Sequence, residues 1–149
     1  MRWAPLVLMT VLGAGCTDLR EFRGEWIGHR VGNNTEALHT GIAGDLARLT
    51  IDRIDGHSFA AQLQVDQLLT PTPIQSIAGA EADVLSGLTF SGDPLKVYLS
   101  FVPIPDNRGE ALIVLALFDD HRIEVRLLRG GGNPLYGIWA LGAASGTAP

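Results

Sequence analysis

Apolar and polar residues alternate along most of this chain, and this alternation constrains the fold more than any other feature. Typical runs are residues 48–52 (RLTID) and 95–101 (LKVYLSF). Successive side chains of a β-strand point to opposite faces, so such runs indicate strands with one buried face. Eight strands are expected, at residues 21–31, 46–54, 58–67, 82–90, 95–102, 111–118, 122–129 and 135–142.

Turn-forming residues separate these runs. Asp55-Gly56 between two alternating segments is a strong hairpin signal. Further turns are expected at 105–109, 119–121 and 130–134. The stretch Thr70 to Pro73 is expected to lie outside the strands, because proline cannot donate to a ladder, and residues 32–44 form a long loop or a short helix.

Sequential hairpins predict an up-and-down meander, and closing it removes exposed sheet edges. The sequence therefore predicts an all-β domain over residues 21–142, an eight-stranded antiparallel up-and-down barrel. A barrel of this size is either filled by side chains or holds one small ligand. The candidate lining residues are Leu49, Ile51, Phe59, Leu63, Val97, Leu99, Val125 and Leu127.

The expected strand at 111–118 is apolar on both faces. We expect Leu112, Val114, Ala116 and Phe118 to fill the barrel. The other face would then point outward, and three large aliphatic side chains there require a cover. That cover is either the chain's own 32–44 segment or proline loop, or a partner. The candidate partner face consists of Ile113, Leu115 and Leu117.

The N-terminus has the parts of a secretory signal. Arg2 precedes an apolar run at 3–12, which small residues and Cys16 follow. The run is shorter than the roughly 20 residues needed to span a bilayer. Cys16 is the only cysteine, and an unpaired cysteine is unusual in a secreted protein. One interpretation of this N-terminus is an ordinary signal peptide whose removal leaves Cys16 as a free thiol. The other interpretation is a lipoprotein signal.

This N-terminus resembles the lipobox signal of bacterial lipoproteins, although Gly13 stands where a large aliphatic residue is usual. The resemblance implies removal of residues 1–15, lipidation (palmitate included) of Cys16, a short tether at 16–20 and anchoring in the cell envelope. Thr17 after the cysteine implies the outer membrane. Residues 143–149 are expected to be a flexible tail.

Two Gly-x-Trp motifs bracket the domain, at Gly24-Glu25-Trp26 and Gly137-Ile138-Trp139. The first motif resembles that of lipocalins and lipocalin-like barrels, and the second resembles the closing strand of small bacterial barrels of the same general kind. The resemblance implies that Trp26 and Trp139 close the barrel and that the glycine of the first motif allows a neighbouring side chain or backbone to approach. The alternative is that a tryptophan stacks on a ligand. The lipocalin disulfide is absent, since the chain has one cysteine.

Little in the chain indicates chemistry. The net charge of −5 argues against a nucleic-acid partner and against a polybasic membrane patch. His29 and His39 have no spacing that requires a metal, while His57 and His121 fall in expected turns. No nucleophile elbow, zinc motif or phosphate-binding loop is present. We expect no catalytic residues, no metal and no cofactor.

The sequence therefore predicts a lipid-anchored envelope lipoprotein with a non-catalytic barrel, acting as a structural or assembly partner in an envelope complex. The alternative is a lipocalin-like carrier of an apolar small molecule or lipid. An enzyme of unknown type is a more distant alternative. A membrane-spanning barrel is disfavoured, because the apolar faces lack paired aromatic girdles.

Overall fold

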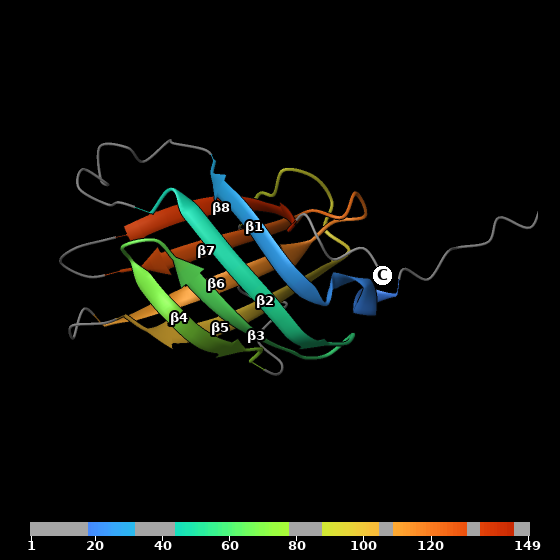
Figure 1. Cartoon of the computed structure of the whole chain (residues 1–149), viewed down its shortest axis with the longest axis horizontal. Helices are drawn as coiled ribbons and strands as arrows, with labels where there is room; N and C mark the ends of the chain where they lie inside the picture. The colour runs from blue at the N-terminus through green and yellow to red at the C-terminus, as the bar shows by residue number, and fades with distance from the viewer. Residues whose placement is uncertain (1–17, 32–43, 78–87, 105–108, 131–134, 145–149) are drawn as a thin grey trace, which may run out of the picture.

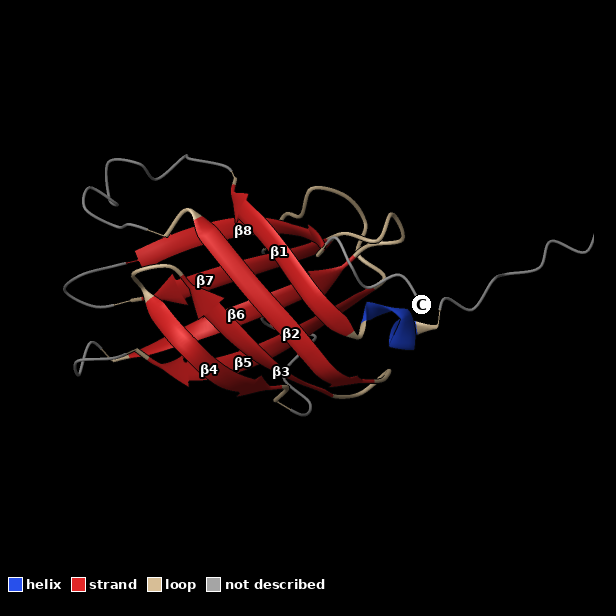
Figure 2. Ribbon diagram, in the orientation of Figure 1, coloured by secondary structure: helices blue, strands red, loops and turns tan. Residues whose placement is uncertain are grey.

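A computed structural model of the chain describes residues 18–31, 44–77, 88–104, 109–130 and 135–144. The expected signal peptide, Cys16, His39 and most of the expected tail lie outside these residues. The described part begins with a short 3-10 helix and continues as strands (Figure 1, Figure 2). The elements are η1 (Leu19–Phe22), β1 (Gly24–Arg30), β2 (Leu46–Ile54), β3 (Phe59–Val65), β4 (Leu69–Gln75), β5 (Lys96–Pro103), β6 (Glu110–Leu117), β7 (Ile123–Arg129) and β8 (Leu135–Ala143).

The strands form one antiparallel sheet in the order β4-β3-β2-β1-β8-β7-β6-β5. The first strand pairs with the last, so the sheet folds back on itself, and in Figure 1 β1 to β4 lie in front of β5 to β8. Just after β4, the Ile77 N–H donates to the Leu99 carbonyl of β5 at 2.9 Å, which links the two edge strands. The predicted fold class is confirmed: eight antiparallel strands make a nearly closed barrel.

One of the expected strands is wrong. Residues 88–90, the described part of the strand expected at 82–90, are not in a strand, and β4 lies earlier, at Leu69–Gln75. That range contains Pro71 and Pro73, which we expected to exclude a strand. Proline is tolerated there because β4 is an edge strand, where an absent N–H breaks no ladder on the outer side. Prolines in β4 and β5 also protect these edges from pairing with another chain.

The hairpin predicted at Asp55-Gly56 joins β2 and β3. The Asp55 carboxylate accepts hydrogen bonds from the backbone N–H groups of His57 and Ser58 at 2.8 and 2.7 Å. These hydrogen bonds lower the pKa of Asp55, because they stabilise its charged form. The side chain thus takes the place of backbone partners within the turn.

The two ends of the barrel differ. The helix end carries η1, the β2–β3 turn and the β6–β7 turn (right in Figure 1). The loop end carries the start of β2, the β3–β4 turn and the start of β8. Between them, inward-facing residues of all eight strands form one apolar core.

Candidate functional site

Apolar side chains of the described residues fill the middle of the barrel interior. Leu63, Val125 and Leu127 have no exposed surface, so no water-sized sphere fits against them. Six of the eight candidate lining residues belong to the apolar core and are at most 2% exposed. They are Leu49, Ile51, Phe59, Leu63, Val125 and Leu127.

The two remaining lining candidates, Val97 and Leu99, were assigned to the wrong face of β5. They pair with Ala116 and Val114 on the outer side, whereas Tyr98 is fully buried in the core. Alternation reveals that a strand has two faces, but it does not reveal which face is inside when both are apolar. Tyr98 in fact points inward, and its hydroxyl donates to the Asp55 carbonyl at the helix end.

The expected orientation of β6 is wrong for the same reason. Ile113, Leu115 and Leu117 are fully buried in the core, so they cannot form a partner face. The register places them opposite Leu127, Val125 and Ile123, on the inner side. The residues expected inside, Leu112, Val114, Ala116 and Phe118, lie outside the core cluster.

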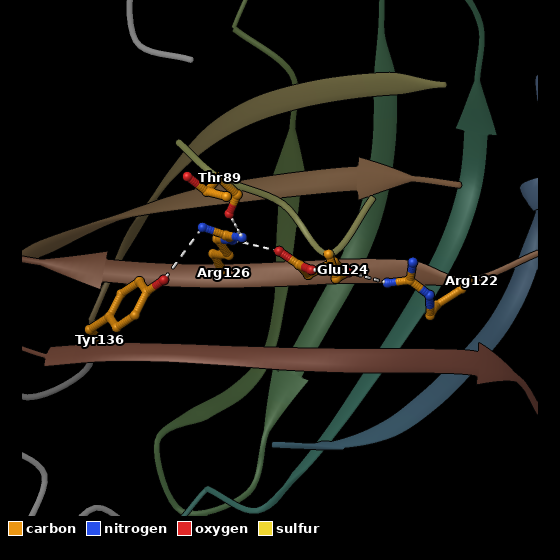
Figure 3. Close-up of polar contacts among 6 residues, drawn as sticks. Thr89, Arg122, Glu124, Arg126 and Tyr136 are labelled. Atoms are coloured by element: carbon orange, nitrogen blue, oxygen red, sulfur yellow. Dashed lines mark hydrogen bonds and ion pairs between the residues drawn. The ribbon is translucent and has the colours of Figure 1, made fainter. Parts of the chain in front are cut away.

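The outer face of β6 and β7 is nevertheless largely buried, because residues 88–95 pass over it. We call this segment the strap. It is held by Arg126 and Glu124 of β7, whose side chains point outward and are only 6% and 3% exposed as residues (Figure 3). Gly92 of the strap lies beside the Phe118 ring. A Cβ added at Gly92 would be 3.8 Å from the nearest ring atoms.

Arg126 is the centre of the contacts under the strap. Its Nε donates to Glu124 Oε1 at 2.5 Å, a second nitrogen donates to the Thr89 carbonyl, and its guanidinium lies 4.6 Å from the Phe90 ring centroid. Arg126 Nη1 also lies 3.5 Å from the Tyr136 hydroxyl.

Glu124 of β7 and Arg122, the residue just before β7, continue this network. The Ser91 hydroxyl donates to Glu124 Oε2 at 2.9 Å and accepts from Arg122 Nη1 at 2.7 Å. The Arg122 guanidinium lies 3.9 Å from the Phe118 ring centroid. Glu124 and Arg126, the buried charges of this network, are therefore paired, as a buried ion pair requires if it is not to destabilise the fold.

Trp26 lies at the helix end. Its ring stacks on Phe22 of η1 with centroids 5.6 Å apart, and its Nε1–H donates to the Phe22 carbonyl at 2.9 Å. His121 lies over the outer side of Phe22, with ring centroids 5.8 Å apart, and its Nε2 is 3.7 Å from the Glu21 carboxylate. The helix and the β6–β7 turn together cover this end of the core.

Trp139 lies nearer the loop end. Its Nε1–H donates to the Gly44 carbonyl, just before β2, at 2.8 Å, and the residue is 1% exposed. The indole folds back over Gly137, where an added Cβ would lie 2.3 Å from the ring. Gly137 therefore gives room for the Trp139 side chain.

Gly24 acts differently. A Cβ there would meet nothing within 4 Å, but the residue has φ +112°, a conformation that other residues rarely adopt. The first Gly-x-Trp motif therefore requires glycine because of its backbone conformation, and not because a neighbouring group approaches closely.

The inward-facing residues of β1, β2 and β3 change in size between the two ends. Toward the helix end, the register aligns Trp26, Leu49 and Leu63. Two residues closer to the loop end it aligns Gly28, Ala47 and Val65. The indole of Trp139 extends from β8 to Gly44, beside this row of small residues, and its hydrogen bond places the ring over the start of β2.

Arg30 ends β1 at the same place. It is paired in register with Trp139, so both residues occupy inward-facing positions. Its Nη2 donates to the Tyr136 carbonyl at 3.3 Å, while its Nε is buried and has no hydrogen-bond partner within the structure. An unsatisfied buried donor of this kind costs about 1–3 kcal/mol, more if charged.

The remaining predicted polar residues lie on the surface. His29 Nδ1 and Asp45 Oδ2 are 2.9 Å apart, and both side chains are exposed. Within the described ranges, His, Cys, Asp and Glu residues form no group of three that could hold a metal. Nor does that part of the chain contain a helix long and apolar enough to cross a membrane.

Hollows on the outer surface include two that described residues line. One, of about 220 Å3, lies over β1 to β3 and is lined mainly by outward-facing side chains such as Glu25, Thr50 and Gln62. The other, of about 280 Å3, lies at the helix end between η1 and the β2–β3 turn. Both mix polar and apolar walls, unlike the enclosed apolar pockets typical of small-molecule sites.

No model of a known protein family matches the chain, and no curated protein matches it. Among solved structures, it is similar to the crystal structure of the wild-type fluorescent protein UnaG, with 20% identity, a TM-score of 0.44, and coverage of 85% of this chain and 99% of that chain. A mutant of the same protein gives 19% identity, a TM-score of 0.43 and the same coverage. The fold described above rests on this chain's own strand order and register.

Proposed function

We propose that this protein is a non-catalytic binding barrel, held at the bacterial envelope by a lipid on Cys16, and that it carries a small apolar molecule near its loop end. The observation that carries the ligand proposal is the position of Trp139. Around Leu49 and Leu63, at the level of Trp26, the interior is filled by buried apolar side chains. Toward the loop end the side chain of Ala47 is small, and the Trp139 indole extends to the Gly44 carbonyl just before β2. The room left at Gly28 is taken by the backbone of β8, because a Cβ there would meet the Ala140 carbonyl.

In this proposal the indole of Trp139 occupies the place that a ligand takes. An indole donates one hydrogen bond, here to the Gly44 carbonyl. A ligand of similar size and apolarity makes the apolar contacts that the indole ring makes in its absence. The displaced indole loses its hydrogen bond to Gly44 and forms one to water instead. The structural or assembly role is the second candidate. It is supported by Phe101, which is 58% exposed and begins an outer apolar row that continues through Leu112 and Leu128.

The ligand proposal is tested with N-phenyl-1-naphthylamine, an uncharged aromatic probe that fluoresces in apolar surroundings. We expect one saturable site in the full-length protein. Ala47→Val narrows the space beside Trp139 and should weaken binding about tenfold or more. Ala60→Val, on the outer side of β3, makes the same change in size and should leave the affinity unchanged. Absence of saturable binding, or equal loss in both variants, would contradict the carrier role.

The anchor is tested separately by labelling cells with a fatty-acid analogue. We expect the label on the protein to be lost in Cys16→Ser and kept in the neighbouring Thr17→Ser. Label that persists in the serine variant at position 16 would exclude lipidation of Cys16. This result would leave the ligand proposal unaffected, because the two proposals rest on different residues.

A further inference from the structure

Arg30 is a charged side chain at an inward-facing position beside the displaceable indole. Along β1 the inward positions are Trp26, Gly28 and Arg30, and register pairs Arg30 with Trp139. The Arg30 side chain also reaches Tyr136, three residues before Trp139 on β8 and nearer the loop end. The guanidinium therefore lies on the loop-end side of the indole, where a ligand in the indole's place would have its outer end.

The hydrogen bonds of this guanidinium are incomplete. Nη2 has one long contact of 3.3 Å to a neutral carbonyl, and the buried Nε has no acceptor within reach in the structure. Arginine usually satisfies its fork of donors with a carboxylate or phosphate in a bidentate pair. None of the ion pairs formed between described residues includes Arg30.

The carboxylate of Asp45, the residue whose backbone bonds that of Arg30, is already paired elsewhere. Asp45 accepts the backbone N–H of Arg30 through its carbonyl at 2.8 Å, but its carboxylate is paired with His29. His29 and Arg30 are successive strand residues, so their side chains point to opposite faces of β1. The Asp45 carboxylate is therefore on the outer side, while the Arg30 side chain belongs to the inner side.

We propose that Arg30 recognises an oxyanion on the ligand, so that the carried molecule is an acid with one flat apolar body and one carboxylate, sulfonate or phosphate group. The inference rests on the proposed carrier function and specifies its ligand class. The apolar body takes the place of the Trp139 indole, and the oxyanion accepts hydrogen bonds from Nε and from the outer nitrogens of Arg30. The acid supplies a charge partner that none of the described residues provides.

Two probes with the same ring system test this directly. 1-Anilinonaphthalene-8-sulfonate carries one sulfonate, and N-phenyl-1-naphthylamine is the same molecule without it. Both are titrated into the full-length protein and into Arg30→Gln, and the ratio of their dissociation constants is compared. Because hydrogen bonds to charged groups are strong, we expect the relative preference for the sulfonate to fall about tenfold or more in Arg30→Gln.

Controls separate this inference from the function on which it rests. Arg53→Gln, an exposed arginine at the helix end, should keep the wild-type ratio, and Arg30→Lys should restore part of it. If the uncharged probe binds all these proteins equally and the ratio does not change in Arg30→Gln, Arg30 does not recognise the anion, although the carrier function stands. If neither probe binds the wild-type protein, both the carrier function and the oxyanion site are wrong.

Discussion

At the scale of single residues, the two glycines of the Gly-x-Trp motifs can be distinguished by experiment. Gly137→Ala places a Cβ 2.3 Å from the Trp139 ring, so the indole must move. We expect a loss of about 1–3 kcal/mol in the free energy of unfolding, as for other overpacked sites. Exchange of the Trp139 indole N–H, measured by NMR, should become faster because its hydrogen bond to Gly44 is disturbed.

Gly24→Ala is the matched control for this prediction. It meets no atom within 4 Å, but it strains the backbone at φ +112°, which costs about 1–3 kcal/mol. A similar loss of stability is therefore expected, with indole exchange at Trp139 unchanged. Slow exchange retained in Gly137→Ala would show that the indole does not depend on that glycine.

At the scale of elements, the strap depends on a buried ion pair. Glu124→Ala leaves the Arg126 guanidinium buried without its carboxylate, which is expected to cost about 3–5 kcal/mol. In the double variant Glu124→Leu, Arg126→Leu no buried charge is left unpaired, so most of this loss should be recovered. Urea unfolding of Glu124→Leu, of Arg126→Leu and of the double variant measures the coupling, and additive losses would contradict a pair that acts as a unit.

Much of this element-level structure could be predicted from the sequence. Alternation gave β2, β3, β5, β6, β7 and β8 to within one or two residues. It failed where local rules compete with position in the fold. Pro71 and Pro73 seemed to exclude a strand, yet β4 is at an edge, and edge position is a property of the complete sheet.

The orientation of β6 failed for a related reason. Both faces of Glu110–Leu117 are apolar because the core covers one and the strap contributes to covering the other. Period two therefore gives no information on which side is inside. The signal lies in the neighbouring strand, where Glu124 and Arg126 alternate with Ile123, Val125 and Leu127 and only the three apolar residues belong to the core. Register with β7 would have assigned β6 correctly.

The candidate site was also only partly accessible from the sequence. Trp139 was identified from its motif, whereas Arg30 was not singled out. The importance of Arg30 depends on its unsatisfied Nε and on its pairing with Trp139. That pairing brings together β1 and β8, which are more than a hundred residues apart in the chain. No local pattern encodes that pairing.

At the scale of the whole molecule, the central claim is that the Trp139 indole occupies the place of a ligand in an otherwise filled barrel. The most direct measurement is 19F NMR of full-length protein labelled with 5-fluorotryptophan, with resonances assigned by Trp139→Phe and Trp26→Phe. On titration with 1-anilinonaphthalene-8-sulfonate, we predict a saturable change of the Trp139 resonance toward its solvent-exposed position, while that of Trp26 stays fixed. Saturable binding that leaves the Trp139 resonance unchanged, or a titration in which no site saturates, would contradict the claim.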